Sequence, residues 1–308
     1  MVPTLALLAA IASASAEELK VPGGSIEIEL MKSPSRAWED VARNWAETSA
    51  RAVSAYYGKF PVPRSRLRIT AVAGTRAKGG RAFGWRGPLI IISLGRDATT
   101  ASLADDWLLT HEMVHLAFPS LAERHHWLEE GIATYVEPIA RARIGGLTRQ
   151  RVWRDLIDGL PQGQPESGDR GLDGTPTWGR TYWGGAIFCL RADVLIRQRT
   201  GNRFGLEDSL RAILAAGGTI DRDWTIDRVL EVGDRAVGVP VLRELYEEMR
   251  SRPVMVDLEG LWRQLGIARR GNTVIFDDKA PLASVRDAIL PAGNLLTRRE
   301  DSSAWHRF

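Results

Sequence analysis

Hydrophobic and polar residues follow two different rhythms along the first hundred residues. Apolar side chains recur at alternate positions in residues 25–31 and 67–73 and run almost continuously through 89–94, which predicts three strands. Residues 35–57 instead place apolar side chains three and four positions apart, which predicts an amphipathic helix. The Gly-rich segment at 78–88 predicts a turn before the third strand.

Two further helices are predicted near the middle of the chain. Residues 102–118, SLADDWLLTHEMVHLAF, have a Ser start, acidic residues in the first turn and periodic apolar positions, and Pro119 ends the helix. After the short loop PSLAERHH, a second helix begins with WLEEGIATYVE. A loop of this length allows the second helix to return antiparallel to the first.

The rest of the chain predicts a second, helical region. Residues 159–181 are dense in Gly, Pro and polar residues and predict a loop that borders the site. Helical patterns then recur in residues 183–200, 206–216, 224–236, 239–250 and 257–265. We therefore expect an α+β protein divided into a signal peptide (1–16), an α+β lobe (17–158), a loop (159–181), a helical lobe (182–270) and a C-terminal tail (271–308).

The motif His111-Glu112-Met113-Val114-His115 is the strongest chemical signal. Two histidines four positions apart share one face of a helix, so both imidazoles can reach one metal ion, and Glu112 remains free beside them. A catalytic zinc ion needs a third protein ligand, which the second helix offers as Glu130. Glu129 competes on spacing alone, although the small residues after Glu130 favour the latter. The alternative is a helix in which these residues make only local hydrogen bonds.

Three blocks in this order resemble the gluzincin zinc metallopeptidases, which have a peptidase MA-like catalytic domain. HEMVH matches the HExxH helix, and WLEEGIATYVE is similar to the third-ligand helix of the aminopeptidase N family. YWGGA at 182–186 is similar to that family's YEKGA segment. A weaker similarity to the glycyl aminopeptidase family extends through 186–214, so the resemblance covers about half of the chain.

The resemblance implies a thermolysin-like gluzincin core, with a small mixed sheet and the zinc helices in the N-terminal lobe and a mostly helical C-terminal lobe. It implies Zn²⁺ bound by His111, His115 and Glu130, with Glu112 as general base and acid and Tyr182 as hydrogen-bond donor to the oxyanion. Further candidates stand nearby. We expect that Arg180, His125 and His126 could contact the oxyanion or the substrate. Thr134 and Glu137 could orient the metal ligands.

One departure from the aminopeptidases concerns the region before the zinc helix. The GxMEN segment, which holds the acidic residue that captures a substrate amine in those enzymes, is missing, and this puts exopeptidase activity in doubt. In gluzincins an edge strand in this region pairs with extended substrate through main-chain hydrogen bonds. The alternative is an ordinary core strand with a flexible loop before it. The shorter spacing between His115 and Glu130 implies a trimmed loop between the two helices.

Composition limits the class of protein and of partner. The 308 residues are 44% hydrophobic and 26% charged, which is typical of a globular chain, and the single Cys189 excludes an intramolecular disulfide. Net charge is only +3, with Arg dispersed among acids, so we expect no nucleic-acid partner.

The first sixteen residues resemble a secretory signal cleaved after Ala16. An uncleaved anchor and a misplaced start codon stay open, because no Lys or Arg precedes the apolar run. No other apolar stretch approaches membrane length, so no stable membrane span is expected after signal removal. The hypothesis is an exported, periplasmic or secreted bacterial zinc metallopeptidase that acts on a peptide or protein substrate. A non-catalytic envelope binding protein with a retained zinc site and a zinc aminopeptidase are the alternatives.

Overall fold

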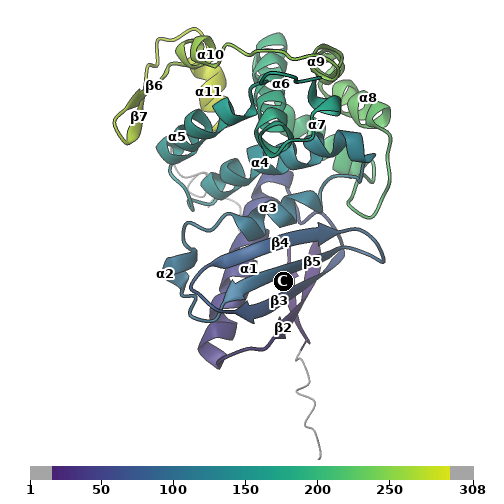
Figure 1. The fold of residues 1–308 in the computed structure, drawn as a ribbon, viewed down its shortest axis with the longest axis vertical. Helices are drawn as coiled ribbons and strands as arrows, with labels where there is room; N and C mark the ends of the chain where they lie inside the picture. The colour runs from purple at the N-terminus through teal and green to yellow at the C-terminus, as the bar shows by residue number, and fades with distance from the viewer. Residues whose placement is uncertain (1–15, 292–308) are drawn as a thin grey trace, which may run out of the picture.

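The computed structural model describes residues 16–291, in which a sheet-bearing part and a helical part lie on opposite sides of two central helices (Figure 1). The predicted signal, apart from its last residue, and the end of the predicted tail lie outside the described residues. No helix within residues 16–291 has both the length and the apolar composition required to cross a membrane.

The sheet contains five strands, with both parallel and antiparallel neighbours. The strands are β1 (Ala16–Val21), β2 (Gly24–Met31), β3 (Arg64–Val72), β4 (Ala77–Phe83) and β5 (Leu89–Gly95). Their order is β1-β2-β3-β5-β4; the pairs β2–β3 and β3–β5 are parallel and the two outer pairs antiparallel. The strands predicted from alternation and from the apolar run are confirmed as β2, β3 and β5.

The first part of the Gly-rich segment is a strand, so the predicted turn is confined to residues 84–87, where the Gly87 N–H donates to the Gly84 carbonyl at 3.0 Å. The strand is β4, which pairs with β5 and has no second strand partner within residues 16–291. Its strand state comes from backbone pairing, not from apolar side chains, and composition therefore concealed it. The pairing shifts between Lys78 and Gly80, where Gly79 has a φ of 56° that glycine adopts without steric cost.

One face of the sheet packs against α1 (Arg36–Tyr57), as the amphipathic pattern predicted. The side chain of Ser35 accepts a hydrogen bond from the Trp38 N–H at 3.2 Å and caps the start of this helix. Alternate strand residues such as Ile28 and Ile69 are buried between the layers. The opposite face carries the polar residues of the same strands.

The long helix predicted at 102–118 consists of two separate helices, which corrects the prediction. They are α2 (Thr100–Leu103) and α3 (Leu108–His115). Asp106, expected in a helical first turn, instead accepts a hydrogen bond from the Leu108 N–H at 3.0 Å and so caps the second helix from outside. After the turn η1 (Glu123–His125), helix α4 (His126–Arg143) follows and packs against α1, α3 and α6.

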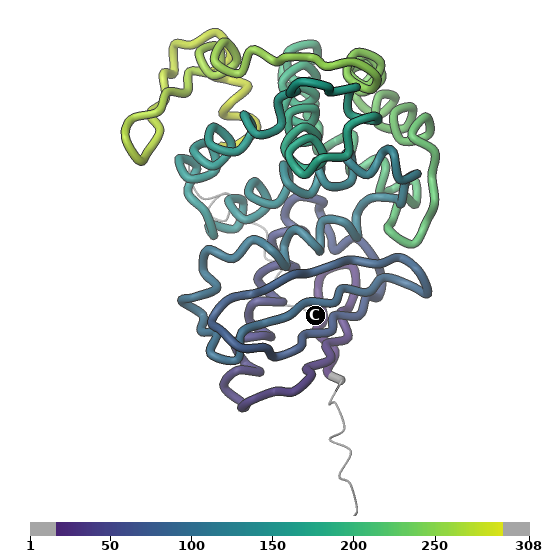
Figure 2. The backbone as a smooth tube through the Cα atoms, in the orientation of Figure 1, coloured from purple at the N-terminus to yellow at the C-terminus, as the bar shows by residue number. Residues whose placement is uncertain are grey.

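The helices after α4 form the second part of the fold (Figures 1 and 2). They are α5 (Arg149–Gly159), α6 (Gly185–Thr200), α7 (Leu206–Ala215), α8 (Ile226–Val237), α9 (Val241–Met249), α10 (Leu258–Leu265) and α11 (Ala283–Ile289). Residues 160–184 contain the short turns η2 (Leu160–Gly163) and η3 (Leu172–Gly174) and the π-helical η4 (Gly179–Gly184). A hairpin of β6 (Ile267–Arg270) and β7 (Thr273–Phe276) precedes α11.

Candidate metal centre

Helices α3 and α4 bring together three metal-donor side chains. The Nε2 atom of His111 lies 3.0 Å and that of His115 lies 3.5 Å from Oε2 of Glu130. One donor atom from each of the three residues lies within 4.8 Å of the other two. A tetrahedral zinc ion with bonds near 2.0–2.2 Å separates its ligand atoms by about 3.3 Å, so this donor set fits zinc in both chemistry and spacing.

Close packing of two helices places Glu130 opposite the segment that carries Tyr182. A Cβ atom on Gly185, the first residue of α6, would stand 2.7 Å from the Cα of Gly131 in α4 and would also overlap the carbonyl oxygen of Trp127. Glycine at both positions therefore lets the two backbones approach directly. This approach holds Glu130 and Tyr182 on facing elements.

Glu112 lies outside the donor set, against the edge strand β4. A Cβ atom on Gly80 would stand 2.9 Å from Cγ of Glu112, so the strand backbone runs directly beside this carboxyl group. Burial raises the pKa of Glu112, while the charge on His115 and a hydrogen bond from the Ala82 N–H oppose that rise. The carboxyl group is thus held between the donors and β4.

Aromatic rings pack against His111. Tyr182, in η4, stacks on His111 with ring centroids 6.1 Å apart, and Trp178 stacks on Tyr182 at 5.9 Å. Burial and the charges of Glu130 and Glu112 raise the pKa of Tyr182 to about 12, so its phenol keeps its proton at neutral pH. Trp107 packs edge-on against His111 at 5.3 Å, and both tryptophans are exposed.

Sequence reasoning gave these two tryptophans no role at the site. Each precedes a site residue by four positions, Trp107 before His111 and Trp178 before Tyr182. That spacing places two side chains on the same helical face, so the signal was present in the sequence.

The structure separates the two adjacent glutamates that competed as ligand. The Oε1 atom of Glu129 accepts a hydrogen bond from the Leu121 N–H at 2.6 Å, and its Oε2 atom lies 2.7 Å from Nδ1 of His126. Nε2 of His126 in turn lies 3.2 Å from Oε1 of Glu130. Glu129 therefore holds the loop between the helices, and Glu130 faces the histidines with its other oxygen.

His126 is the one further sequence candidate that touches a donor residue among the described residues. Its hydrogen bonds to Glu129 and Glu130 raise its pKa to about 10, because each ring nitrogen faces a carboxylate. The imidazole is then doubly protonated and donates from both nitrogens. It orients the carboxylate that completes the donor set.

The remaining candidates contact other groups. His125 is buried and its Nδ1 lies 3.1 Å from Asp173, which also accepts from Trp127 and Tyr246. The Arg180 guanidinium forms a buried ion pair with Asp169 at 2.7 Å, and Glu137 forms one with Arg141 at 2.9 Å. The Thr134 hydroxyl is buried without a hydrogen-bond partner among residues 16–291.

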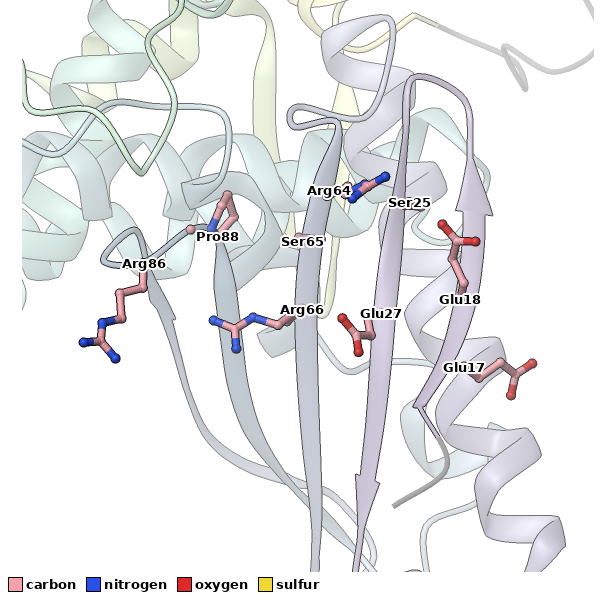
Figure 3. Close-up of a pocket in the computed structure, with 10 residues that line it drawn as sticks. Glu17, Glu18, Ser25, Glu27, Arg64, Ser65, Arg66, Arg86 and Pro88 are labelled. Atoms are coloured by element: carbon pink, nitrogen blue, oxygen red, sulfur yellow. The ribbon is translucent and has the colours of Figure 1, made fainter. Parts of the chain in front are cut away.

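A pocket of about 480 Å³ lies on the open face of the sheet, away from the donor set (Figure 3). Acidic and basic side chains line it together, among them Glu17, Glu18, Glu27, Arg64, Arg66 and Arg86. None of the metal-donor residues lines it, and neither does Glu112 or Tyr182.

Comparison with known proteins gives matches in structure only. No protein-family model matches the sequence, and no curated protein matches it significantly. An aminopeptidase N family protein from Idiomarina loihiensis is 14% identical over 83% of this chain and 49% of its own, with a TM-score of 0.61. An M1 zinc metallopeptidase from Deinococcus radiodurans is 16% identical over 78% and 52%, with a TM-score of 0.50.

Yeast LTA4 hydrolase is 12% identical over 79% of this chain and 40% of its own, with a TM-score of 0.50. The chain thus spans about half the length, or less, of the solved chains it matches. At such low identity the likeness is one of architecture. The chain shares the fold of these solved M1 zinc metallopeptidase and aminopeptidase N family proteins, in agreement with its sequence resemblance.

Proposed function

We propose that this protein is a zinc-dependent metallopeptidase in which His111, His115 and Glu130 hold Zn²⁺. The observation that carries the proposal is the donor set itself. Three donor atoms stand at zinc-ligand spacing beside a carboxyl group, Glu112, that is not one of them. The fold, shared with solved M1 zinc metallopeptidases, supports the same reading.

The catalytic roles follow from where each side chain lies. When bound, zinc supplies a Lewis acid that polarises a carbonyl group and lowers the pKa of water. Glu112 accepts a proton from the attacking water and passes it to the leaving amine. Tyr182 keeps its phenolic proton at neutral pH and donates a hydrogen bond to the oxygen on which negative charge develops.

Edge strand β4 is the proposed binding site for the substrate backbone. It passes directly beside Glu112 at Gly80 and has an unpaired edge among the described strands. An extended peptide can add to such an edge by main-chain hydrogen bonds, which would bring a scissile bond next to Glu112.

Endopeptidase activity is favoured over aminopeptidase activity. Residues 74–88, which contain β4, include no Asp or Glu, so the strand offers no carboxylate for a free substrate amine. We further propose export of the enzyme, on the strength of the signal-like pattern in residues 1–16.

Metal analysis and peptide hydrolysis test the proposal together. Wild-type protein should contain zinc and cleave casein and internally quenched peptides, and N-acetylation should not abolish peptide cleavage. Glu112→Ala should keep zinc and lose hydrolysis, whereas Glu259→Ala, an exposed glutamate on α10, should keep both. Equal hydrolysis by the wild type and Glu112→Ala would overturn the mechanism. Zinc binding without hydrolysis in wild type would indicate a binding protein, and cleavage only of peptides with a free N-terminus would indicate an aminopeptidase.

A further inference from the structure

All charged residues in the segment that contains β4 are basic. Residues 74–88 include the four basic residues Arg76, Lys78, Arg81 and Arg86 and no acidic residue. All four are exposed, and none forms a salt bridge within residues 16–291. Elsewhere most arginines are paired: the chain has 41 basic and 38 acidic residues, and ion pairs are found on most of the helices. Lys78 donates to the Ala73 carbonyl and Arg81 lies over the Phe83 ring, but neither has an acidic partner among the described residues.

Arg81 lies at the point where β4 passes Glu112. Its neighbours Gly80 and Ala82 both face that carboxyl group, the first by close approach and the second through its N–H. Burial raises the pKa of both Glu112 and Tyr182, and the positive charge of Arg81 opposes that rise in each by a smaller amount. A charge at this position acts on any ligand that lies along β4.

Strand register places Arg81 on the open face of the sheet. Arg81 pairs with Ile91 of β5, an exposed residue on the open face of the sheet. A peptide strand added to the other edge of β4 would place one side chain directly opposite Arg81, with Cβ atoms about 4.5–5.5 Å apart. Opposite charges at that spacing attract, and like charges repel.

Asp221, an acid near the end of β4, already has partners. The loop after α7 touches Gly84 at the end of the strand and carries Asp221. Asp221 accepts a hydrogen bond from Thr219 at 2.6 Å and lies 3.8 Å from the Arg222 guanidinium. Lys78 and Arg81 form no salt bridge within residues 16–291, so a carboxylate from outside can pair with them. Positive charges on an edge strand disfavour pairing with the same strand of another copy, because like charges repel. They favour pairing with an acidic peptide.

We propose that β4 selects substrates whose segment along the strand is acidic, with Asp or Glu opposite Arg81. The inference rests on the proposed peptidase function and names its substrate class. It makes Arg81 a specificity-determining residue, which acts on substrate binding and takes no part in proton transfer.

Binding to zinc-loaded Glu112→Ala protein tests the inference without turnover. Three fluorescent peptides share one apolar centre and differ in flanking residues, which are Glu, Gln or Lys. The Glu peptide should bind about fivefold more tightly than the Gln peptide at low salt, and the advantage should shrink in 0.5 M NaCl. Adding Arg81→Glu should reverse the order of the Glu and Lys peptides. Adding Arg263→Glu, the same charge change at an exposed site on α10, should leave the order unchanged.

The outcomes separate the inference from the proposed function. If wild type cleaves the Gln peptide and Arg81→Glu leaves the order of binding unchanged, the inference is wrong and the peptidase proposal stands. An equal effect of Arg81→Glu and Arg263→Glu would also overturn the inference, because net charge alone would then explain it. If wild type neither binds nor cleaves any of the three peptides, both fail.

Discussion

Replacement of Gly185 by alanine tests whether the close approach of α4 and α6 builds the metal centre. The added Cβ would stand 2.7 Å from the Cα of Gly131. Carbon atoms in contact prefer separations of about 3.5–4.0 Å, so the two helices must move apart by about 1 Å. Glu130 is adjacent to Gly131, and Tyr182 lies three residues before Gly185, so the shift separates two site residues.

Gly185→Ala is expected to lower both the stability of the fold and the rate of catalysis. Forcing an extra methyl group into a packed interface costs about 1–3 kcal/mol, of which alanine's better helix propensity returns at most about 1 kcal/mol. A displacement of about 1 Å in a catalytic group can lower the rate by about 100-fold. We therefore expect a net loss of about 1–2 kcal/mol in the free energy of unfolding, weaker zinc binding and a large fall in kcat.

Urea unfolding, zinc titration and peptide hydrolysis measure the three effects. Gly233→Ala on α8 is the matched control, because its Cβ would overlap no backbone atom: it would meet the end of the Leu242 side chain at 2.5 Å and make ordinary contacts with Ser209 and Ile213. That variant should keep zinc affinity and activity. Gly185→Ala protein with wild-type unfolding energy and wild-type zinc affinity would refute the role assigned to the glycine contact.

Three other predictions follow from the site and from a buried ion pair. Glu130→Ala should release zinc during dialysis, whereas Glu129→Ala should retain it with somewhat lower affinity; the opposite pattern, measured by metal analysis, would exchange their roles. Tyr182→Phe should lower kcat by about 100-fold with little change in KM or zinc content, since it removes one oxyanion donor; unchanged kcat would exclude that role. Burial raises the pKa of Glu137 from an ordinary 4.5 to about 7, so the folded chain holds this proton after the unfolded chain has lost it. The contribution of Glu137 to stability should therefore fall as pH rises from about 4.5 to 7, and Glu137→Gln should remove that part of the slope in urea unfolding at pH 5 and 7.5.

The sequence predicts that His111, His115 and Glu130 lie together, because their arrangement is largely local. His111 and His115 are one helical turn apart, and Glu130 follows after a loop too short to carry its helix far away. The interior strands and α1 are likewise marked by periodic burial. These features depend on side chains whose spacing directly reports the element.

Features that depend on tertiary pairing could not be predicted from residue spacing. Strand β4 has glycines where a strand usually has apolar residues, and only its register with β5 reveals it. Asp106 was indistinguishable from a first-turn acid until the gap between α2 and α3 placed it outside the helix. The hydrogen bonds of His126 to two glutamates require the folded turn before α4, which spacing alone does not specify.

The hydrogen bonds from Leu121 through Glu129 and His126 to Glu130 couple a surface connection to the metal centre. Surface loops ordinarily accept insertions and deletions, because their backbone contacts little else. Here the loop between α3 and α4 is hydrogen-bonded at Leu121 to Glu129, and Glu129 contacts the His126 side chain that orients Glu130. Its length is therefore constrained by the chemistry of the site, and a longer loop would need another way to orient Glu130.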